Sequence, residues 1–285
     1  MLQIRLIEGQ MNIRKIESRD NSRLKLARKV RDGLEREFIF VEGVRLAEEA
    51  VRAGVPVDFC LVDGGSVADG RIKHLLQTIE GETSDLFEVD SKYFQSLADT
   101  KSSQGIVLIC AHPPAGRGSF ERSTSKGSTA VPLVVMLGEV NNPANLGAVV
   151  RTVEAAGAAG VIVSKNSADP FSAKALRGSM GSAFRLPIWV NASYKDAFEW
   201  ARSNGFSTVG SSINASRTYT DLDWKQRRLL ILGSEARGIE PEIAAQLEET
   251  VTIPMSEKVE SLNLAVAAVI IVFEARRQIA SAKKG

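Results

Sequence analysis

Three turns in the second half of the chain each place polar side chains or a glycine directly after an apolar run. The residues are, in chain order, Asn145 and Arg151, Gly233 and Glu235, and Ser261 and Asn263. Amide, guanidinium, carboxylate and hydroxyl groups can bind and orient a polar substrate, and glycine lets a ligand approach the backbone. Ligand sites in α/β domains form where strands end and helices begin. We therefore expect the three turns to converge on one site.

Each of these residues also has a purely structural interpretation. Asn145 can cap a helix, and Arg151 can be a solvated surface arginine. Gly233 can serve a turn, and Glu235 can complement the dipole of a helix. Ser261 can cap the helix that follows it. Taken one at a time, the residue types leave both interpretations open.

The elements that must position these residues alternate between strand and helix from Val131 onward. Val131–Leu137 and residues 229–232 read as strands that lead into the first two turns, and residues 262–279 read as a long helix after the third. The strands are continuous apolar runs, which is typical of a parallel sheet covered on both faces. The pattern predicts an α/β domain over residues 131–285.

An earlier part of the chain, residues 12–112, shows the same alternation and predicts a smaller α/β domain. No catalytic constellation stands out in it, so binding or support is its expected role. Residues 113–130 are rich in Gly, Ser, Pro and Thr, which predicts a linker. Residues 1–10 show no clear pattern, and Met11 is a candidate first residue of the folded part.

Basic residues are concentrated between Arg14 and Arg31, although the net charge of the chain is only +2. This stretch contains eight Lys and Arg residues against Glu17 and Asp20. Such clustering can neutralise the phosphates of a nucleic acid, and the alternative is a solvated helix face. The residues that we assign to RNA binding are Arg14, Arg23, Lys25, Arg28 and Lys29.

Composition argues against several other classes of protein. The chain has two histidines and lacks CxxC and HExxH spacings, so we expect no metal site. Cys60 and Cys110 lie in apolar runs and are expected to be reduced core residues. No apolar run reaches the ~18 residues of a membrane span, so we expect no membrane partner and a cytoplasmic location. No GxGxxG or GxxxxGK[ST] motif follows a strand.

Together, in this order, the three turns resemble a known family. NNPANLGAVVRTVEAAG, LILGSEARG and IPMSEKVESLNLAVAAVIIVFEA resemble the three motifs of the SpoU/TrmH family of RNA ribose 2′-O-methyltransferases, within the SPOUT superfamily. The resemblance covers residues 131–280. The first domain resembles the ribosomal-protein-like RNA-binding domain of many members through VEGVRLAEEAV and TKSSQGIVLI. One departure is Asn142 before Pro143, where many members have an aspartate.

The resemblance implies a fold and a reaction. Members transfer a methyl group from S-adenosyl-L-methionine to a ribose 2′-hydroxyl in tRNA or rRNA, and the separate first domain favours rRNA here. Their catalytic domain has a parallel sheet and a deep trefoil knot, a rare exception to unknotted topology. They act as homodimers through this domain. The alternatives are a non-catalytic RNA-binding or ribosome-assembly protein on the same fold, and an antibiotic-resistance rRNA methyltransferase.

The resemblance also implies roles for individual residues. Arg151 orients the ribose and phosphate and is a candidate base, although an arginine pKa above about 12 makes that second role difficult. The remaining polar positions of the motifs are expected to orient the substrate: Asn145, Glu235, Ser261 and Asn263. The residues expected against the cofactor are Gly233, Ile253, Met255 and Leu262.

Overall fold

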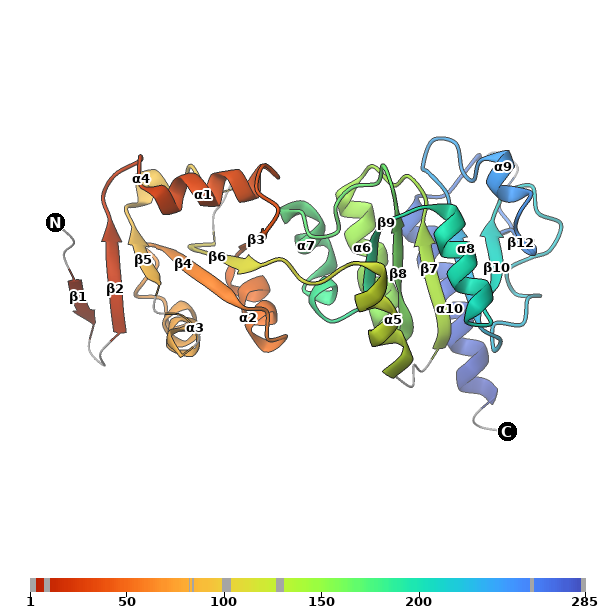
Figure 1. Cartoon of the computed structure of the whole chain (residues 1–285), viewed down its shortest axis with the longest axis horizontal. Coiled ribbons are helices and arrows are strands. Elements are labelled where there is room, and N and C mark those ends of the chain that lie inside the picture. The colour runs from red at the N-terminus through yellow and green to blue at the C-terminus, as the bar shows by residue number, and fades with distance from the viewer. Residues whose placement is uncertain are drawn as a thin grey trace. The chain divides into compact units, whose positions relative to one another are not determined.

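A computed structural model describes residues 4–7, 11–81, 83, 85–98, 104–126, 131–256 and 259–282. The chain forms two compact units (Figure 1). Unit 1 contains Met1–Pro113 and Phe171–Phe184, and unit 2 contains Pro114–Pro170 and Arg185–Gly285. Unit 1 thus takes a segment from the middle of the sequence of unit 2. The first four residues of the predicted stretch TKSSQGIVLI lie outside the described residues.

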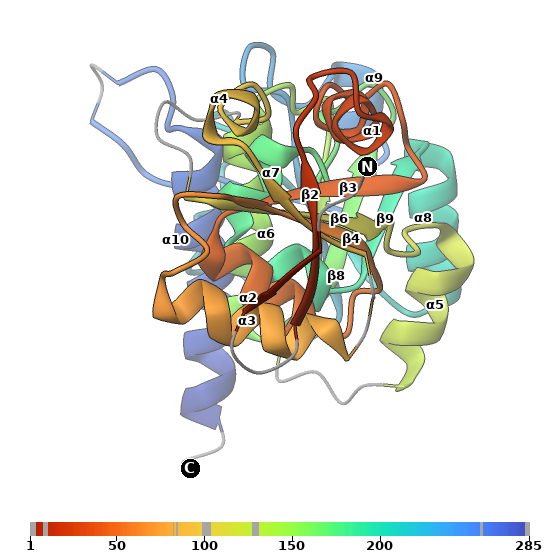
Figure 2. The ribbon, with the colours of Figure 1, turned by 90° about the vertical axis from the view of Figure 1, so that its left-hand side faces the viewer.

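Unit 1 is built on a mixed sheet with the strand order β1-β2-β5-β4-β6-β3. Its elements are β1 (Ile4–Ile7), β2 (Met11–Ile16), α1 (Ser22–Arg31), β3 (Phe38–Glu42), α2 (Val44–Arg52), β4 (Val57–Asp63), α3 (Gly70–Glu80), β5 (Leu86–Val89), α4 (Ser91–Phe94), β6 (Ile106–Ala111), α7 (Ala173–Ser179) and η1 (Ser182–Phe184). Figures 1 and 2 show α1 and α4 on one face of the sheet and α2 and α3 on the opposite face. The predicted α/β domain is confirmed.

Strands β1 and β2 were not predicted. Ile4–Ile7 pairs antiparallel with Met11–Ile16, which in turn pairs parallel with β5. The prediction that the folded part begins at Met11 is therefore wrong for Ile4–Ile7. Basic residues interrupt the apolar positions of these short strands, so their pattern is weak, and pairing with a neighbour decides their structure.

One hydrophobic core of unit 1 lies between the sheet and α1, α4 and α7. The side chains of Leu24, Ala27 and Val30 on α1 are buried there, as their helical spacing predicted. Ala173 of α7 belongs to the same core. The Arg177 guanidinium, also on α7, lies 3.5 Å from the carboxylate of Glu42, whose side chain is only 2% exposed. The segment 171–184 is therefore part of the packing of unit 1.

Unit 2 contains a sheet in which every strand pair is parallel, with the order β12-β10-β11-β7-β8-β9. Its elements are α5 (Arg117–Lys126), β7 (Val131–Leu137), α6 (Pro143–Ala156), β8 (Ala158–Ser164), β9 (Ile188–Ala192), α8 (Tyr194–Ser203), β10 (Ser207–Ser211), β11 (Arg228–Leu232), α9 (Pro241–Ala244), β12 (Glu249–Val251) and α10 (Leu264–Ala282). Helices α5 and α8 cover one face, and α6 and α10 cover the other (Figures 1 and 2). The predicted parallel sheet is confirmed. The trefoil knot stays a prediction.

The strand order reverses beside β7. The chain proceeds from β7 outward to β8 and β9, and then returns to fill the other side with β11, β10 and β12. In open α/β sheets the crevice for a ligand lies at the carboxyl ends of the strands at such a reversal. The ends of β7 and β11 are therefore the expected place for a site. In the described part of the chain, no helix is both long enough and apolar enough to cross a membrane.

Helix α5 corrects the predicted linker at residues 113–130. Arg117–Lys126 is helical, and its Phe120 is 1% exposed. The Phe120 ring centroid lies 6.1 Å from that of Trp189 and 5.3 Å from that of Trp200. The linker prediction rested on small polar residues, whereas a single buried aromatic side chain anchors the helix. Residues 127–130 of the predicted linker lie outside the described residues.

The caps of α6 and α10 decide two of the structural alternatives. The side chain of Asn142 accepts a hydrogen bond from the Ala144 N–H (3.0 Å), so Asn142, and not Asn145, caps α6. The side chain of Asn263 accepts one from the Ala265 N–H (2.9 Å) at the start of α10. Asn263 therefore occupies the capping position that Ser261 was considered for.

The buried position of Phe120 predicts a large loss of stability in Phe120→Ala. The substitution leaves a cavity against two tryptophans and should lower the free energy of unfolding by about 3–5 kcal/mol. Urea denaturation followed by tryptophan fluorescence measures this. Ser123→Ala, at an exposed position on the same helix, is the control. Equal stability of the two variants would mean that the Phe120 side chain does not anchor α5 to the core.

The cap of α10 predicts a difference between two neighbouring variants. Asn263→Ala removes the acceptor for the Ala265 N–H and should lower the free energy of unfolding by about 1 kcal/mol. Ser261→Ala should change it by less than about 0.5 kcal/mol, as expected for an exposed residue outside the cap. Thermal and urea denaturation of both variants test this. The reverse order of stabilities would contradict the assignment of the cap.

Candidate functional site

The loops that follow β7 and β11 meet at the carboxyl edge of the unit 2 sheet. The Gly138 N–H, just after β7, donates to the Leu232 carbonyl at the end of β11 (2.8 Å). A Cβ on Gly233 would lie 2.1 Å from the carbonyl carbon of Gly238, so only glycine fits there. The backbones of Ser234 and Gly238 exchange two hydrogen bonds of 2.9 Å and close a tight loop. This loop holds Glu235 at the sheet edge.

A chain of hydrogen bonds joins the three sequence motifs. The Asn263 side-chain amide donates to the side-chain oxygen of Asn145 at 3.4 Å, across 118 residues of sequence. The Asn145 amide donates in turn to the Glu235 carboxylate, across 90 residues. All three residues lie at the surface: Glu235 and Asn263 are exposed, and Asn145 is half-buried. The predicted convergence is therefore seen directly for Asn145, Glu235 and Asn263.

Asn263 fixes the orientation of this network. Its side-chain oxygen accepts from the Ala265 N–H, so its amide nitrogen is left to donate to Asn145. An amide has one acceptor and one donor end, and here each end has its own partner. The Asn145 amide is used in the same way, with its nitrogen directed to Glu235. The network can hold the Glu235 carboxylate in one orientation toward a ligand.

Two of the predicted catalytic residues, Arg151 and Ser261, are not part of this network. Arg151 is exposed on α6, and within the described part of the chain it has no hydrogen bond or ion pair. Ser261 is exposed and makes no hydrogen bond to another described residue. The roles of both residues stay predictions. An exposed guanidinium without a carboxylate partner is available to an anionic ligand.

The predicted cofactor residues beyond Gly233 lie on the chain between β12 and α10. Ile253, Met255 and Leu262 are each half-buried. Their contact with a cofactor stays a prediction. Among the described residues, no group of three or more His, Cys, Asp or Glu side chains could hold a metal ion.

The site edge also contains an ion pair that was not predicted. The Arg237 guanidinium donates to the Glu139 carboxylate (2.9 Å) and lies 3.5 Å from that of Glu240. It joins the loop after β7 to the loop after β11. Glu139 has a left-handed backbone (φ 52°), and its N–H donates to the Ser164 hydroxyl (2.8 Å). Arg237 lies within a quoted motif and Glu139 lies two residues before another, but their spacing in sequence gave no sign of the pairing.

Tyr194 supports the same loop from α8. A Cβ on Gly138 would lie 1.9 Å from the Tyr194 hydroxyl oxygen, so glycine at this position lets the phenol approach the backbone. Burial raises the pKa of Tyr194, and the nearby carboxylates of Glu139 and Glu240 raise it further. The phenol is therefore a neutral group against the loop backbone. No signal in the sequence pointed to it, because Tyr194 reads only as the start of a helix.

Three of the five predicted RNA-binding residues have carboxylate partners, and two of these are arginines that also pack on aromatic rings. Arg14 pairs with Asp85, and its guanidinium lies 4.4 Å from the centre of the Phe87 ring. Arg23 pairs with Asp85 and, at 3.2 Å, with Asp58. These contacts cover aromatic rings of the sheet and neutralise the charges. They support the structural alternative for these two arginines, and their contact with RNA stays a prediction.

The other three predicted RNA-binding residues lie on α1. Arg28 donates to the Ser96 hydroxyl (3.0 Å) and to the Arg19 carbonyl (3.3 Å). Lys25 is exposed, with its amine 3.1 Å from the Asp20 carboxylate. Lys29 is exposed and has no ion pair with another described residue. Lys25 and Lys29 are therefore the members of the set most open to a phosphate.

Comparison with known proteins identifies the families of both parts of the chain. Residues 132–273 match the SpoU rRNA Methylase family, and residues 21–108 match the MRM3-like substrate binding domain. The first match contains the whole hydrogen-bonded network of Asn145, Glu235 and Asn263. The second lies within unit 1.

Named relatives and solved structures agree with these matches. The 23S rRNA (guanosine(2553)-2'-O)-methyltransferase RlmP of Bacillus subtilis is 27% identical over 268 residues, which cover 93% of this chain and 100% of the relative. An uncharacterized tRNA/rRNA methyltransferase of Mycolicibacterium paratuberculosis is 30% identical over 239 residues, covering 81% of this chain and 74% of the relative.

Two solved structures are similar over nearly the whole chain. The AdoMet-bound rRNA methyltransferase of Sinorhizobium meliloti has a TM-score of 0.80 at 27% identity, covering 93% of this chain and 98% of that one. The SpoU methyltransferase AviRb of Streptomyces viridochromogenes has a TM-score of 0.78 at 28% identity, covering 92% and 99%. Motifs, fold and both domain matches point the same way: the chain belongs to the SpoU rRNA methylase family.

Proposed function

We propose that this chain transfers the methyl group of S-adenosylmethionine to a ribose 2′-hydroxyl of ribosomal RNA. The observation that carries the proposal is the hydrogen-bonded chain from Asn263 through Asn145 to Glu235, which unites three motifs of the family at one sheet edge. RlmP, similar along its full length, is named as a 2′-O-methyltransferase of 23S rRNA. The similar protein of Sinorhizobium meliloti binds AdoMet. The proposed substrate also implies a cytoplasmic location.

The residues at the sheet edge suit such a cofactor. When bound, S-adenosylmethionine supplies a methyl group that is activated by a positively charged sulfur. Gly233 presents backbone without a side chain, in a loop too tight for any other residue. Ile253, Met255 and Leu262 are half-buried apolar side chains, which are suited to an adenine ring. These four residues are the proposed cofactor contacts.

The chain's own polar residues have the task of orienting a weak nucleophile. A neutral ribose hydroxyl reacts slowly, so positioning and electrostatics must supply much of the rate. Asn145, Glu235 and Asn263 form a network that can hold the hydroxyl in place, and Ser261 lies beside it in sequence. Arg151 is exposed and available to the phosphate next to the ribose. Because an arginine side chain is not deprotonated in proteins, we assign Arg151 to binding and orientation.

Helix α10 supports the further proposal that the protein is a homodimer through unit 2. Val266, Val269 and Phe273 are 47%, 42% and 42% exposed. Their spacing of three and four residues places them on one face of the helix. An apolar stripe of this kind on a surface helix is typical of a protein interface. A trefoil knot in unit 2, as the family resemblance implies, belongs to the same proposal.

The proposed role of Arg151 predicts the behaviour of Arg151→Ala. Loss of the guanidinium should lower the rate of methyl transfer from labelled S-adenosylmethionine to rRNA by about 100-fold or more. Cofactor affinity, measured by calorimetry, should stay unchanged. Arg202→Ala, at an exposed position on α8, is the matched control. Full activity of Arg151→Ala would exclude its role, and absence of cofactor binding by the wild-type protein would favour the non-catalytic RNA-binding alternative.

The apolar face of α10 predicts that a charge will disrupt the dimer. Val269→Asp should convert the protein from dimer to monomer, because a carboxylate in an apolar interface loses its hydration. Light scattering after size-exclusion chromatography measures the mass. The substitution leaves intact the hydrogen bonds that Arg277 and Gln278 donate to the Glu274 carboxylate on the same helix. A wild-type monomer would refute the dimer proposal, and an undiminished dimer in Val269→Asp would move the interface elsewhere.

A further inference from the structure

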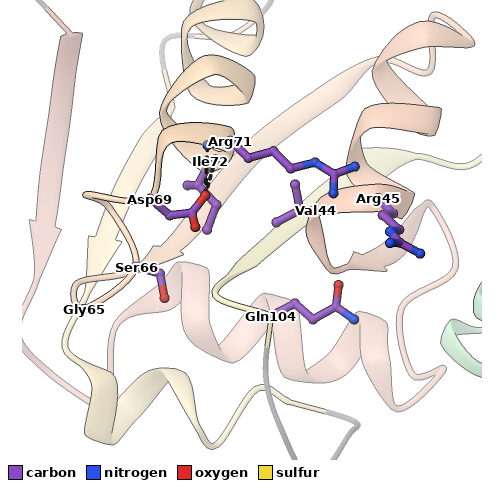
Figure 3. A pocket seen from close by; sticks show the side chains of 8 residues that line it. All are labelled: Val44, Arg45, Gly65, Ser66, Asp69, Arg71, Ile72 and Gln104. Atoms are coloured by element: carbon purple, nitrogen blue, oxygen red, sulfur yellow. Dashed lines mark hydrogen bonds between the residues drawn. The ribbon is translucent and has the colours of Figure 1, made fainter.

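Unit 1 contains a pocket of about 420 Å³, which lies outside the site described above (Figure 3). The residues that line it are Val44, Arg45, Gly65, Ser66, Asp69, Arg71, Ile72 and Gln104. Its volume is within the range of ~300–1,000 Å³ that is typical of small-molecule sites. Every lining residue falls within residues 21–108, which match the MRM3-like substrate binding domain.

Three segments that are distant in sequence form this pocket. Val44 and Arg45 belong to the quoted stretch VEGVRLAEEAV, and Gln104 belongs to TKSSQGIVLI. The two stretches that carry the resemblance of this domain therefore meet at the pocket. The third segment is the loop after β4 with the start of α3. A Cβ on Gly43 would lie 2.5 Å from the side-chain oxygen of Gln104, so glycine at this position makes room for Gln104.

Arg71 gives the pocket a fixed, flat surface. Its Nε and Nη2 donate to the two carboxylate oxygens of Glu48, each at 2.6 Å. The hydrogen bond from Arg71 lowers the pKa of Glu48, so this carboxylate stays ionised and the pair has no net charge. A bidentate partner holds the guanidinium plane in place, and such planes stack on nucleobases. Figure 3 shows this side chain extended along one side of the pocket, opposite Gln104.

The other side chains provide one cation, hydrogen-bonding groups and an apolar floor. Arg45 is exposed and has no hydrogen bond or ion pair with another described residue. The Gln104 amide likewise has no hydrogen-bond partner among the described residues. The Ser66 hydroxyl donates to Asp63 (3.0 Å) and keeps its lone pairs as acceptors. Ile72, which is 3% exposed, and the half-buried Val44 are the apolar members.

We propose that this pocket binds one unpaired nucleotide of the RNA substrate. The base stacks on the Arg71 guanidinium, Gln104 and Ser66 bond its polar edge, and Arg45 binds its phosphate. Sequence-dependent RNA recognition uses bases that are splayed out of a loop or bulge, stacked on aromatic or arginine planes, and hydrogen-bonded at their edges. A base within a duplex cannot enter a pocket of this kind. The inference rests on the proposed function, since it assumes that RNA is the substrate.

The test compares variants of the full-length protein for binding of labelled single-stranded and duplex RNA of one sequence. Arg45→Ala and Gln104→Ala should each weaken single-strand binding by about 10-fold, the effect of losing a hydrogen bond to a charged or buried partner. Duplex binding should be unchanged. Arg52→Ala is the control, because it removes the same charge from the same helix at a side chain that is 68% exposed. Both pocket positions are exposed, so both variants should fold.

The salt dependence of binding separates a nucleotide from a simple phosphate contact. Gln104→Ala changes no charge, so it should weaken binding without changing the slope of log K against log salt. An effect of Arg45→Ala alone, with a slope reduced by about 0.7, would mean a backbone phosphate only and would overturn the proposal. Wild-type affinity in both variants would also overturn it.

Methyl transfer by the wild-type protein distinguishes this inference from the proposed function. If the wild-type protein methylates rRNA and the pocket variants keep the wild-type affinity and KM, only the inference fails. If the variants lose single-strand affinity while the wild-type protein methylates no RNA, the pocket stands and the proposed reaction fails.

Discussion

The site depends on the two hydrogen bonds made by the side-chain amide of Asn263. Its oxygen accepts the Ala265 N–H at the start of α10, and its nitrogen donates to Asn145 near the start of α6. Asn145 in turn holds Glu235. The point at which α10 begins therefore sets the geometry of polar groups on α6 and on the loop after β11. Helix capping and site assembly use one group, so neither can change independently of the other.

Much of the fold follows from local patterns. The apolar run Val131–Leu137 predicted β7 with its exact bounds, and continuous runs of this kind predicted the parallel sheet. Membership of the SpoU/TrmH family is confirmed by the matched families and similar structures. Helix α5 was missed because its position depends on the burial of Phe120 between tryptophans from other elements. A ten-residue window contains no sign of such partners.

The site and the basic segment show the same limit for polar residues. The partners of Asn145 lie 90 and 118 residues away, and only the tertiary fold brings them together. The sequence analysis counted Arg14 and Arg23 as available cations. Their carboxylate partners, Asp58 and Asp85, come from later segments of the chain that the fold of unit 1 brings to them. Local charge counts therefore overestimate the cationic surface. Groups that fold into ion pairs are already neutralised before any ligand arrives.

The sharing of residues 171–184 has a consequence for how the protein can be divided. The chain passes from one unit to the other at 113, at 170 and at 184. Cutting it at any single one of these places leaves the units covalently joined elsewhere. A fragment that ends at Pro113 would lack Ala173 in its core and Arg177 beside Glu42. Unit 1 is thus not a detachable module, and a gene fusion that borrows it would have to carry α7 as well.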